Sequence, residues 1–402
     1  MACDFDRIIE RRDTDSIKWN QDVVEVLFNN RDAIPMWVAD MDFEIAKPIQ
    51  DAISKRAQHP VYGYATPGSS VIEAIVDRMK RLYGWEIRPE WIVFTPGVVP
   101  ALYAAVRAYT HPGDGVVMQS PVYYPFWSAI RDNGCIPLDN ELVLKDKHYE
   151  IDFDDLEYRF QNSPFTGIVP QSARAKMMIL CSPHNPGGRV WTSQELERIG
   201  EICLKNNAIM VSDEIHCDLI FKGHTHTPFA AISREFEDNS VVLVSPSKTF
   251  NLAGLGTSVA IIPDPGLKKA FTNQTNGIMP MANPFGLAAL EAAYRYGDEW
   301  LEELMAYLEK SLDFLMAYFA QRIPDITPIR PEGTYLVWLD CSRLGMDDET
   351  LKRFFMEKCG LGLDNGPIFG PSGSGFQRIN IACPRSRLEQ ALEGIEKAIK
   401  DL

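Results

Sequence analysis

The sequence predicts an α/β protein with a mostly parallel sheet that is covered by helices on both faces. Short runs of apolar and β-branched residues recur along the chain, and each run is almost continuously apolar. Runs of this kind are typical of strands buried on both faces. Segments with helical spacing lie between the runs, and such alternation of strand and helix favours a parallel sheet. The expected strands span residues 91–94, 115–118, 176–180, 208–211, 241–244 and 259–262.

The expected helices follow in the same order. One begins after the turn at residues 95–97 and runs to about residue 109. Another covers residues 192–206, where Thr192 and Glu195 have the spacing of a capping box. A long helical region from about residue 284 to 320 carries apolar residues at helical spacing.

The pattern changes after the long helical region, which predicts a second and smaller α/β domain. Its expected strands are 334–339 and 377–382, and its expected helices are 348–358 and 385–400. The N-terminal segment lacks a clear α/β unit, so we expect it to join the small domain or to cross the active site. The predicted organisation is an N-terminal segment (1–45), a large domain (46–288) and a small domain (289–402).

The composition is close to the globular average, with 46% of 402 residues hydrophobic and 24% charged. It excludes a disordered chain, a collagen-like repeat and a coiled-coil rod. The net charge of −15 repels phosphate backbones and anionic lipids, so we expect neither a nucleic-acid nor a membrane partner. The N-terminus lacks the apolar core of a signal peptide. The eight cysteines form no CxxC motif, as expected for reduced thiols in a cytoplasmic protein.

Lys248 is the first candidate for chemistry because it lies just beyond the expected strand at 241–244. Ligands of open α/β sheets bind at the carboxyl ends of the strands. A desolvated lysine at such a place can form a Schiff base with a carbonyl cofactor. The alternative is an ordinary surface lysine in a loop.

Two further polar residues follow strands in the same way. Asp213 follows the expected strand at 208–211, where a buried carboxylate can hold a pyridine nitrogen protonated. The alternative is an N-cap for the next helix. Asn185 lies in a Pro/Gly-rich stretch after the strand at 176–180 and can donate to a ring hydroxyl. The alternative is a simple turn.

Two more segments have the chemistry of anion sites. The glycine turn at 95–99 opens a helix, and the free amides of a helix N-terminus suit a phosphate. Ser245 and Ser247 can add hydroxyl donors to the same anion. Arg378 follows a glycine-rich stretch at 369–375 and can bind a carboxylate with two hydrogen bonds. The alternatives are an ordinary strand–helix turn and a surface salt bridge.

Taken in order, these motifs resemble the pyridoxal phosphate (PLP)-dependent aminotransferase superfamily of fold type I, over essentially the whole chain. The resemblance implies a large domain with a mostly parallel seven-stranded sheet and a smaller α/β domain. It implies that Lys248 is the Schiff-base lysine and the acid/base at the substrate Cα. It also implies that Asp213 partners the pyridine nitrogen, that Asn185 and His216 lie near the ring O3′, and that Tyr123 stacks on the ring.

The resemblance assigns the remaining residues to the phosphate and to the substrate. The phosphate cup comprises Gly97, Val98, Val99, Ser245 and Ser247. A homodimer is implied, because Tyr64 matches a tyrosine that reaches the phosphate of the neighbouring subunit. The substrate, a small molecule of the amino-acid class, is expected to contact Arg378 through its α-carboxylate, and also Asn185, Trp37 and Ala39.

Three departures from ordinary aminotransferases indicate one branch of the superfamily. Gly256 stands where an arginine usually binds the phosphate, His216 replaces the usual tyrosine, and residues 37–43 read WVADMDF. With the string SDEIHCDL at 212–219, these features resemble the cystathionine β-lyase and carbon–sulfur lyase group related to the bacterial modulator of the maltose regulon. The implied reaction is β-elimination from an S-substituted L-cysteine, giving a thiol, pyruvate and ammonia.

Alternative functions remain open from the sequence. The same residues permit an aminotransferase, and a related protein also represses a transcription activator by contact, so a regulatory binding protein is a further alternative. The sulfur substrate is not determined: cystathionine, cysteine, cystine and larger conjugates all fit. A zinc site is not expected, because no standard structural finger has the spacing found at His216, Cys217, His224 and His226.

Overall fold

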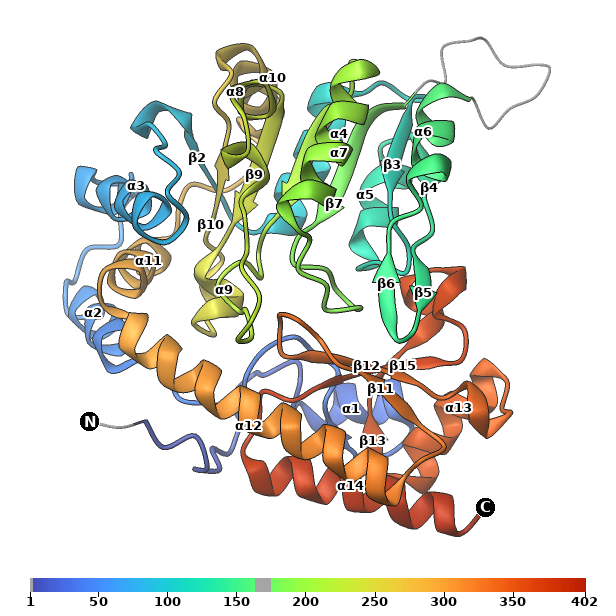
Figure 1. Cartoon of the computed structure of the whole chain (residues 1–402). Helices are drawn as coiled ribbons and strands as arrows, with labels where there is room; N and C mark the ends of the chain where they lie inside the picture. The colour runs from blue at the N-terminus through green and yellow to red at the C-terminus, as the bar shows by residue number, and fades with distance from the viewer. Residues whose placement is uncertain (1–2, 163–174) are drawn as a thin grey trace.

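The computed structural model describes residues 3–162 and 175–402. Its main feature is a seven-stranded sheet in the order β2-β10-β9-β8-β7-β3-β4 (Figure 1). The strand β10 is antiparallel to both of its neighbours, and the other neighbouring pairs are parallel. The predicted mostly parallel sheet is therefore confirmed. In chain order its strands are β2 (Ile92–Thr95), β3 (Gly115–Met118), β4 (Ile136–Asp139), β7 (Ala175–Cys181), β8 (Ile209–Asp213), β9 (Ser240–Val244) and β10 (Ser258–Ile261).

The strand that the run pattern did not indicate is β4, at the edge of the sheet. It contains Pro137 and is only partly buried, so it lacks the continuous apolar run of the inner strands. Proline is tolerated at a sheet edge because the missing N–H leaves no neighbouring strand unpaired.

Helices cover both faces of this sheet. The helices of the large domain are α2 (Lys47–Ala57), α3 (Ser69–Tyr83), α4 (Val98–Tyr109), α5 (Pro125–Asp132), α6 (Phe153–Gln161), α7 (Ser193–Lys205), α8 (Arg234–Asp238), α9 (Pro246–Thr249), α10 (Pro265–Thr275) and α11 (Pro284–Tyr296). On β7, Met177 and Ile179 join the apolar cluster of α4, α5 and α10, whereas Met178 and Leu180 join that of α6 and α7. Adjacent residues of one strand therefore enter different cores, which explains the continuous apolar runs.

The expected capping box is present at the start of α7. The side chain of Thr192 accepts a hydrogen bond from Glu195 N at 3.2 Å, and Thr192 N donates to the Glu195 carboxylate at 2.8 Å. The expected long helical region is divided in two at Gly297, where α11 ends and α12 (Asp298–Arg322) begins.

The small domain lies below the large sheet in Figure 1 and contains a four-stranded antiparallel sheet in the order β11-β12-β15-β14. Its strands are β11 (Thr327–Ile329), β12 (Leu336–Asp340), β14 (Asp364–Asn365) and β15 (Phe376–Asn380). Its helices after α12 are α13 (Asp348–Arg353), which continues into a π-helical turn (Phe354–Lys358), and α14 (Arg385–Lys400). A hairpin of β5 (Val143–Lys145) and β6 (His148–Glu150) extends from the large domain.

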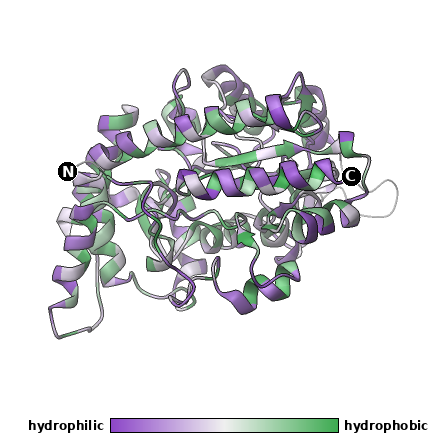
Figure 2. Cartoon of the chain, turned by 90° about the horizontal axis from the view of Figure 1, so that it is seen from below, coloured by the Kyte–Doolittle hydropathy of each residue, from purple (hydrophilic) through white to green (hydrophobic). Residues whose placement is uncertain are grey.

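The N-terminal segment lies with the small domain and then enters the region between the domains. After α1 (Gln21–Phe28), β1 (Ile34–Pro35) pairs in parallel with β13 (Leu361–Gly362). Figure 2, seen from the small-domain side, shows hydrophilic and hydrophobic residues alternating along the outer helices, as expected for amphipathic helices. No helix in the described parts of the chain is both long enough and apolar enough to cross a membrane.

Candidate active site

A cavity of about 180 Å³ opens at the carboxyl ends of the central strands. This is where ligands of open α/β sheets bind. The cavity gathers residues from β8, α4, α9 and loops that are far apart in the sequence. The predicted site residues that line it are Ala39, Gly97, Val98, Val99, Tyr123, Asn185, Asp213, His216, Ser245, Ser247 and Lys248.

Lys248 lies in the short helix α9, directly after β9. Its Nζ donates to the carbonyl oxygen of Ala39 at 2.7 Å, and the hydroxyl of Tyr335 donates to the same oxygen at 2.9 Å. Burial lowers the pKa of Lys248 to about 8, although Asp40 and Asp213 oppose the change. A large fraction of the amine is therefore neutral near pH 8, and a neutral amine can act as a nucleophile or a base.

Asp213 ends β8 on the same wall of the cavity. Its carboxylate accepts a hydrogen bond from Ile215 N at 3.1 Å, and burial raises its pKa to about 7. An ionised carboxylate at this depth needs a positive partner. A protonated ring nitrogen would supply that charge, so the position fits the pyridine of PLP.

His216 and Asn185 add further polar atoms to the lining of the cavity. Burial lowers the pKa of His216 to about 3, so its ring is neutral. Its Nδ1 is buried and has no hydrogen-bond partner among the described residues. Such an atom favours a ligand that can pair with it, because an unsatisfied buried polar group is unfavourable. The backbone carbonyl oxygen of Asn185 accepts a hydrogen bond from the backbone N–H of Tyr123 at 3.1 Å, which holds the predicted stacking residue in place.

The part of the cavity that is lined by the N-terminus of α4 fits a phosphate. Helix α4 has Gly97 at its N-cap, and no side chain caps its first amides. The free N–H groups of Val98 and Val99 and the positive end of the helix dipole therefore face the cavity. The hydroxyl of Ser247 adds a further donor, whereas that of Ser245, 2.9 Å from it, also donates to the carbonyl oxygen of Thr257 at 3.0 Å.

Arg378 lies on β15 of the small domain and is 2% exposed. Its Nη1 donates to Asn185 Oδ1 at 2.9 Å, so the two domains meet at this contact. Its Nη2 donates to the carbonyl oxygen of Trp37 at 2.9 Å and also pairs with Asp364. The structure thus brings Arg378, the residue predicted to bind the substrate carboxylate, into contact with Asn185, which is predicted to bind the cofactor.

Trp37 and Tyr64 lie differently from the other predicted residues. The ring of Trp37 packs edge-on against Phe28 with centroids 5.9 Å apart, and only its carbonyl reaches Arg378. Tyr64 is 97% exposed in the loop between α2 and α3 and is not among the described residues that line the cavity. Their roles toward substrate and phosphate stay predictions.

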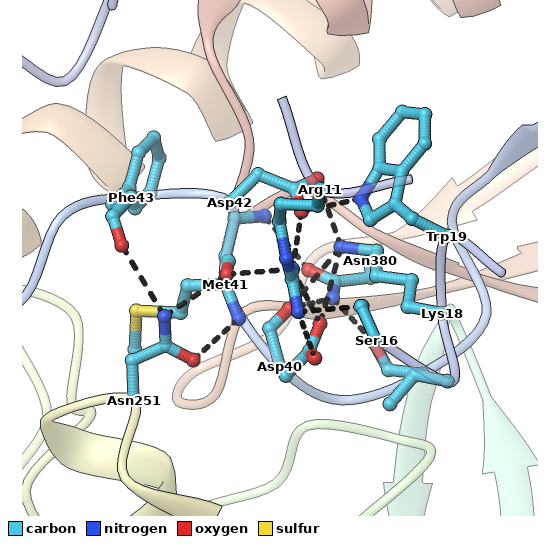
Figure 3. A network of polar contacts seen from close by, with 12 residues as sticks. Arg11, Ser16, Lys18, Trp19, Asp40, Met41, Asp42, Phe43, Asn251 and Asn380 are labelled. Carbon is cyan, nitrogen blue, oxygen red and sulfur yellow. Dashed lines mark hydrogen bonds and ion pairs between the residues drawn. The ribbon is translucent and has the colours of Figure 1, made fainter. Parts of the chain in front are cut away.

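The loop that carries Ala39 is held by a buried charge network (Figure 3). The carboxylate of Asp42 pairs with Arg11 at 2.6 Å and with Lys18 at 2.9 Å, and it accepts a hydrogen bond from Trp19 Nε1 at 2.8 Å. Asp40 pairs with Arg11 at 2.8 Å. The network fixes the backbone on the carboxyl side of Ala39, whose carbonyl receives Lys248.

Sequence reasoning did not assign several of these residues. The acids of the loop, Asp40 and Asp42, belong to the WVADMDF string but had no role in the prediction. Asp364 and Tyr335 carried no local motif, because they reach the site only through the folding of the small-domain sheet.

The histidine and cysteine group at 216–226 has other partners. His226 pairs with the buried Glu214 at 2.9 Å, while His216 lines the cavity. Within residues 3–162 and 175–402, no group of three or more His, Cys, Asp or Glu is arranged to hold a metal ion.

The chain is similar to known proteins over nearly its whole length. Residues 33–395 match the family model described as aminotransferase class I and II. The chain is similar to cystathionine beta-lyase PatB of Bacillus subtilis, with 43% identity over 98% of this chain and 99% of that protein. It is 30% identical to protein MalY of Escherichia coli over 99% of each. Cystalysin from Treponema denticola, whose structure contains PLP, has a TM-score of 0.94 at 37% identity, covering 100% of both chains. The expected fold type I is thereby confirmed.

Proposed function

The chain belongs to the aminotransferase class I and II family, and from that premise we propose that it is a PLP-dependent carbon–sulfur β-lyase. Its substrates are L-cystathionine or related S-substituted L-cysteines, and its products are a thiol, pyruvate and ammonia. The observation that carries the proposal is that buried Lys248 and Asp213 line the same cavity, in a chain 43% identical to a cystathionine β-lyase along its length.

The cofactor supplies an electron sink that acidifies the Cα–H bond of a bound amino acid. Asp213 keeps the ring nitrogen protonated by pairing its carboxylate with it. Lys248, as a neutral amine, accepts the Cα proton and can deliver a proton to the departing sulfur. The carbonyl of Ala39 orients that amine. Arg378 and Asn185 bind the α-carboxylate, and the amides of Val98 and Val99 bind the phosphate.

The proposal includes a cytoplasmic homodimer in which Tyr64 reaches the phosphate of the partner's site. Tyr64 is 97% exposed, and its neighbours Val61 and Tyr62 are 62% and 57% exposed. Exposed apolar side chains gathered on one loop favour an interface. The free state of all eight cysteines agrees with a reducing compartment.

An aminotransferase is the second candidate, since the matching family model carries that description. Such an enzyme uses the same lysine, but it returns the Cα proton to the cofactor and then needs an oxo acid for each new cycle. The two candidates therefore differ in what an oxo acid does to turnover.

The test is incubation of the PLP-loaded protein with L-cystathionine, with and without an added oxo acid. The proposed lyase releases pyruvate over many turnovers in both cases. Turnover that stops after one equivalent per site unless an oxo acid is present would identify an aminotransferase.

A further inference from the structure

The guanidinium of Arg378 has partners inside the protein on two of its three nitrogens, Nη1 and Nη2. It offers five N–H donors in one plane. Nη2 donates to the carbonyl of Trp37 and pairs with Asp364, so both of its protons are used. Nη1 donates to Asn185, and Nε has no partner among the described residues.

This arrangement obstructs the usual way of binding a carboxylate. Two parallel hydrogen bonds require two adjacent donors of the guanidinium. The adjacent pairs are Nη1 with Nη2 and Nη2 with Nε, so Nη2 belongs to both. An incoming carboxylate can dock in this way on Arg378 only if Trp37 or Asp364 gives up its bond to Nη2.

The carbonyl of Trp37 is the less movable of the two partners. The backbone is tied on both sides of it: Asn380 N donates to the carbonyl of Met36 at 2.9 Å, and Asn380 Nδ2 donates to that of Val38 at 2.6 Å. Asp364 is bound to Arg378 through its side chain alone, so it can rotate away.

Asp364 faces Arg378 directly across the antiparallel strands β14 and β15. The other titratable groups near its carboxylate are Tyr123 and Tyr124, the two residues that precede α5; burial raises the pKa of both, and the charge of Asp364 adds to that rise. Burial raises the pKa of Asp364, and the guanidinium only partly offsets that effect. Its ionised form therefore depends on Arg378.

We propose that Asp364 is a specificity-determining residue whose carboxylate competes with the substrate's α-carboxylate for Nη2 of Arg378. The inference rests on the proposed function in one respect, that Arg378 receives the α-carboxylate. Protonated Asp364 is a weaker competitor than the anion. Affinity for amino acids, relative to amines without a carboxylate, therefore falls as rising pH ionises Asp364.

The test compares two probes on the PLP-loaded protein by the change in cofactor absorbance on binding. L-Alanine carries an α-carboxylate without a leaving group, and ethylamine carries none. In Asp364→Asn, the Kd for L-alanine falls about tenfold, because an amide competes less well than an anion for Arg378. The Kd for ethylamine is unchanged. Asp325→Asn removes one charge from an exposed position and leaves both values unchanged.

An unchanged or raised Kd for L-alanine in Asp364→Asn would overturn the proposal, the raised value indicating that Asp364 only positions Arg378. If that variant does not fold, the wild type decides: the ratio of the L-alanine Kd to the ethylamine Kd rises with pH if Asp364 competes and stays flat if it does not. Absence of pyruvate from L-cystathionine would refute the lyase function, but the alanine comparison would still decide the role of Asp364.

Discussion

At the scale of single residues, the site depends on two groups whose pKa values burial shifts in opposite directions. It lowers the pKa of Lys248 to about 8 and raises that of Asp213 to about 7. Both changes follow from the poor solvation of charge inside the protein. Lys248 thereby becomes a usable base. Asp213, in contrast, needs the positive charge of a ligand to remain ionised.

The first prediction concerns Asp213. Asp213→Asn removes the anion that keeps the ring nitrogen protonated, so kcat falls by roughly 10²- to 10³-fold, the size expected for the loss of one positioned charge. The measurement is pyruvate release by the PLP-loaded variant, with Asp213→Glu as the variant that keeps the charge. A kcat for Asp213→Asn within about twofold of wild type would contradict the assigned role.

At the scale of elements, the N-terminal segment is held by the network around Asp42. Burial raises the pKa of Asp42, but the charges of Lys18 and Arg11 outweigh it, so the pKa lies below its ordinary value of 3.8. A carboxyl with a lowered folded-state pKa adds stability above its unfolded-state pKa. That contribution is lost as the pH falls below about 4 and through the folded-state value.

The second prediction is that Asp42→Asn lowers the free energy of unfolding by about 3 kcal/mol near pH 7, because Lys18 and Arg11 lose the buried carboxylate that pairs with both, and Lys18 keeps only its longer ion pair with Asp40 at 3.4 Å. Urea unfolding measures this. The control is Asp22→Asn, whose side chain is 80% exposed and pairs with Arg31 at 3.0 Å. That change should stay within about 1 kcal/mol. Equal losses of unfolding free energy in the two variants would mean that the buried network stabilises the fold no more than an exposed ion pair does.

Buried inner strands and edge strands differ in how clearly the sequence marks them. Inner strands such as β9, which is apolar in every residue after Ser240, were recognisable without the structure. Strand β4 was not, because a half-exposed edge strand with Pro137 lacks that signal. Polar residues at the carboxyl ends of the inner strands, such as Asp213 at the end of β8 and Lys248 in the short helix after β9, were recognisable for the same reason. Asp364 was not, because β14 has only two residues and its partner is set by tertiary pairing.

At the scale of the whole molecule, the cavity is lined by the large domain and by Ala39 of the N-terminal loop, and the small domain reaches one of its lining residues through Arg378. Arg378 from the small domain contacts Asn185 from the large domain. Ala39 from the N-terminal segment receives Lys248. A change that alters the relative position of these parts therefore alters substrate binding and proton transfer together.

The third prediction concerns the dimer. Inactive Lys248→Ala subunits are mixed with Tyr64→Ala subunits and allowed to exchange. Each mixed dimer then contains one site with both residues intact, and about a quarter of wild-type activity returns at equal mixing. Activity that stays at the average of the two parent variants would show that Tyr64 does not act across the interface.

The most direct test of the central claim is the ratio of pyruvate to free thiol released from L-cystathionine without an oxo acid. β-Elimination gives equal amounts of both over many turnovers, and Lys248→Ala gives neither, because that lysine removes the Cα proton. Thiol without pyruvate, or unchanged turnover in Lys248→Ala, would contradict β-elimination at this site.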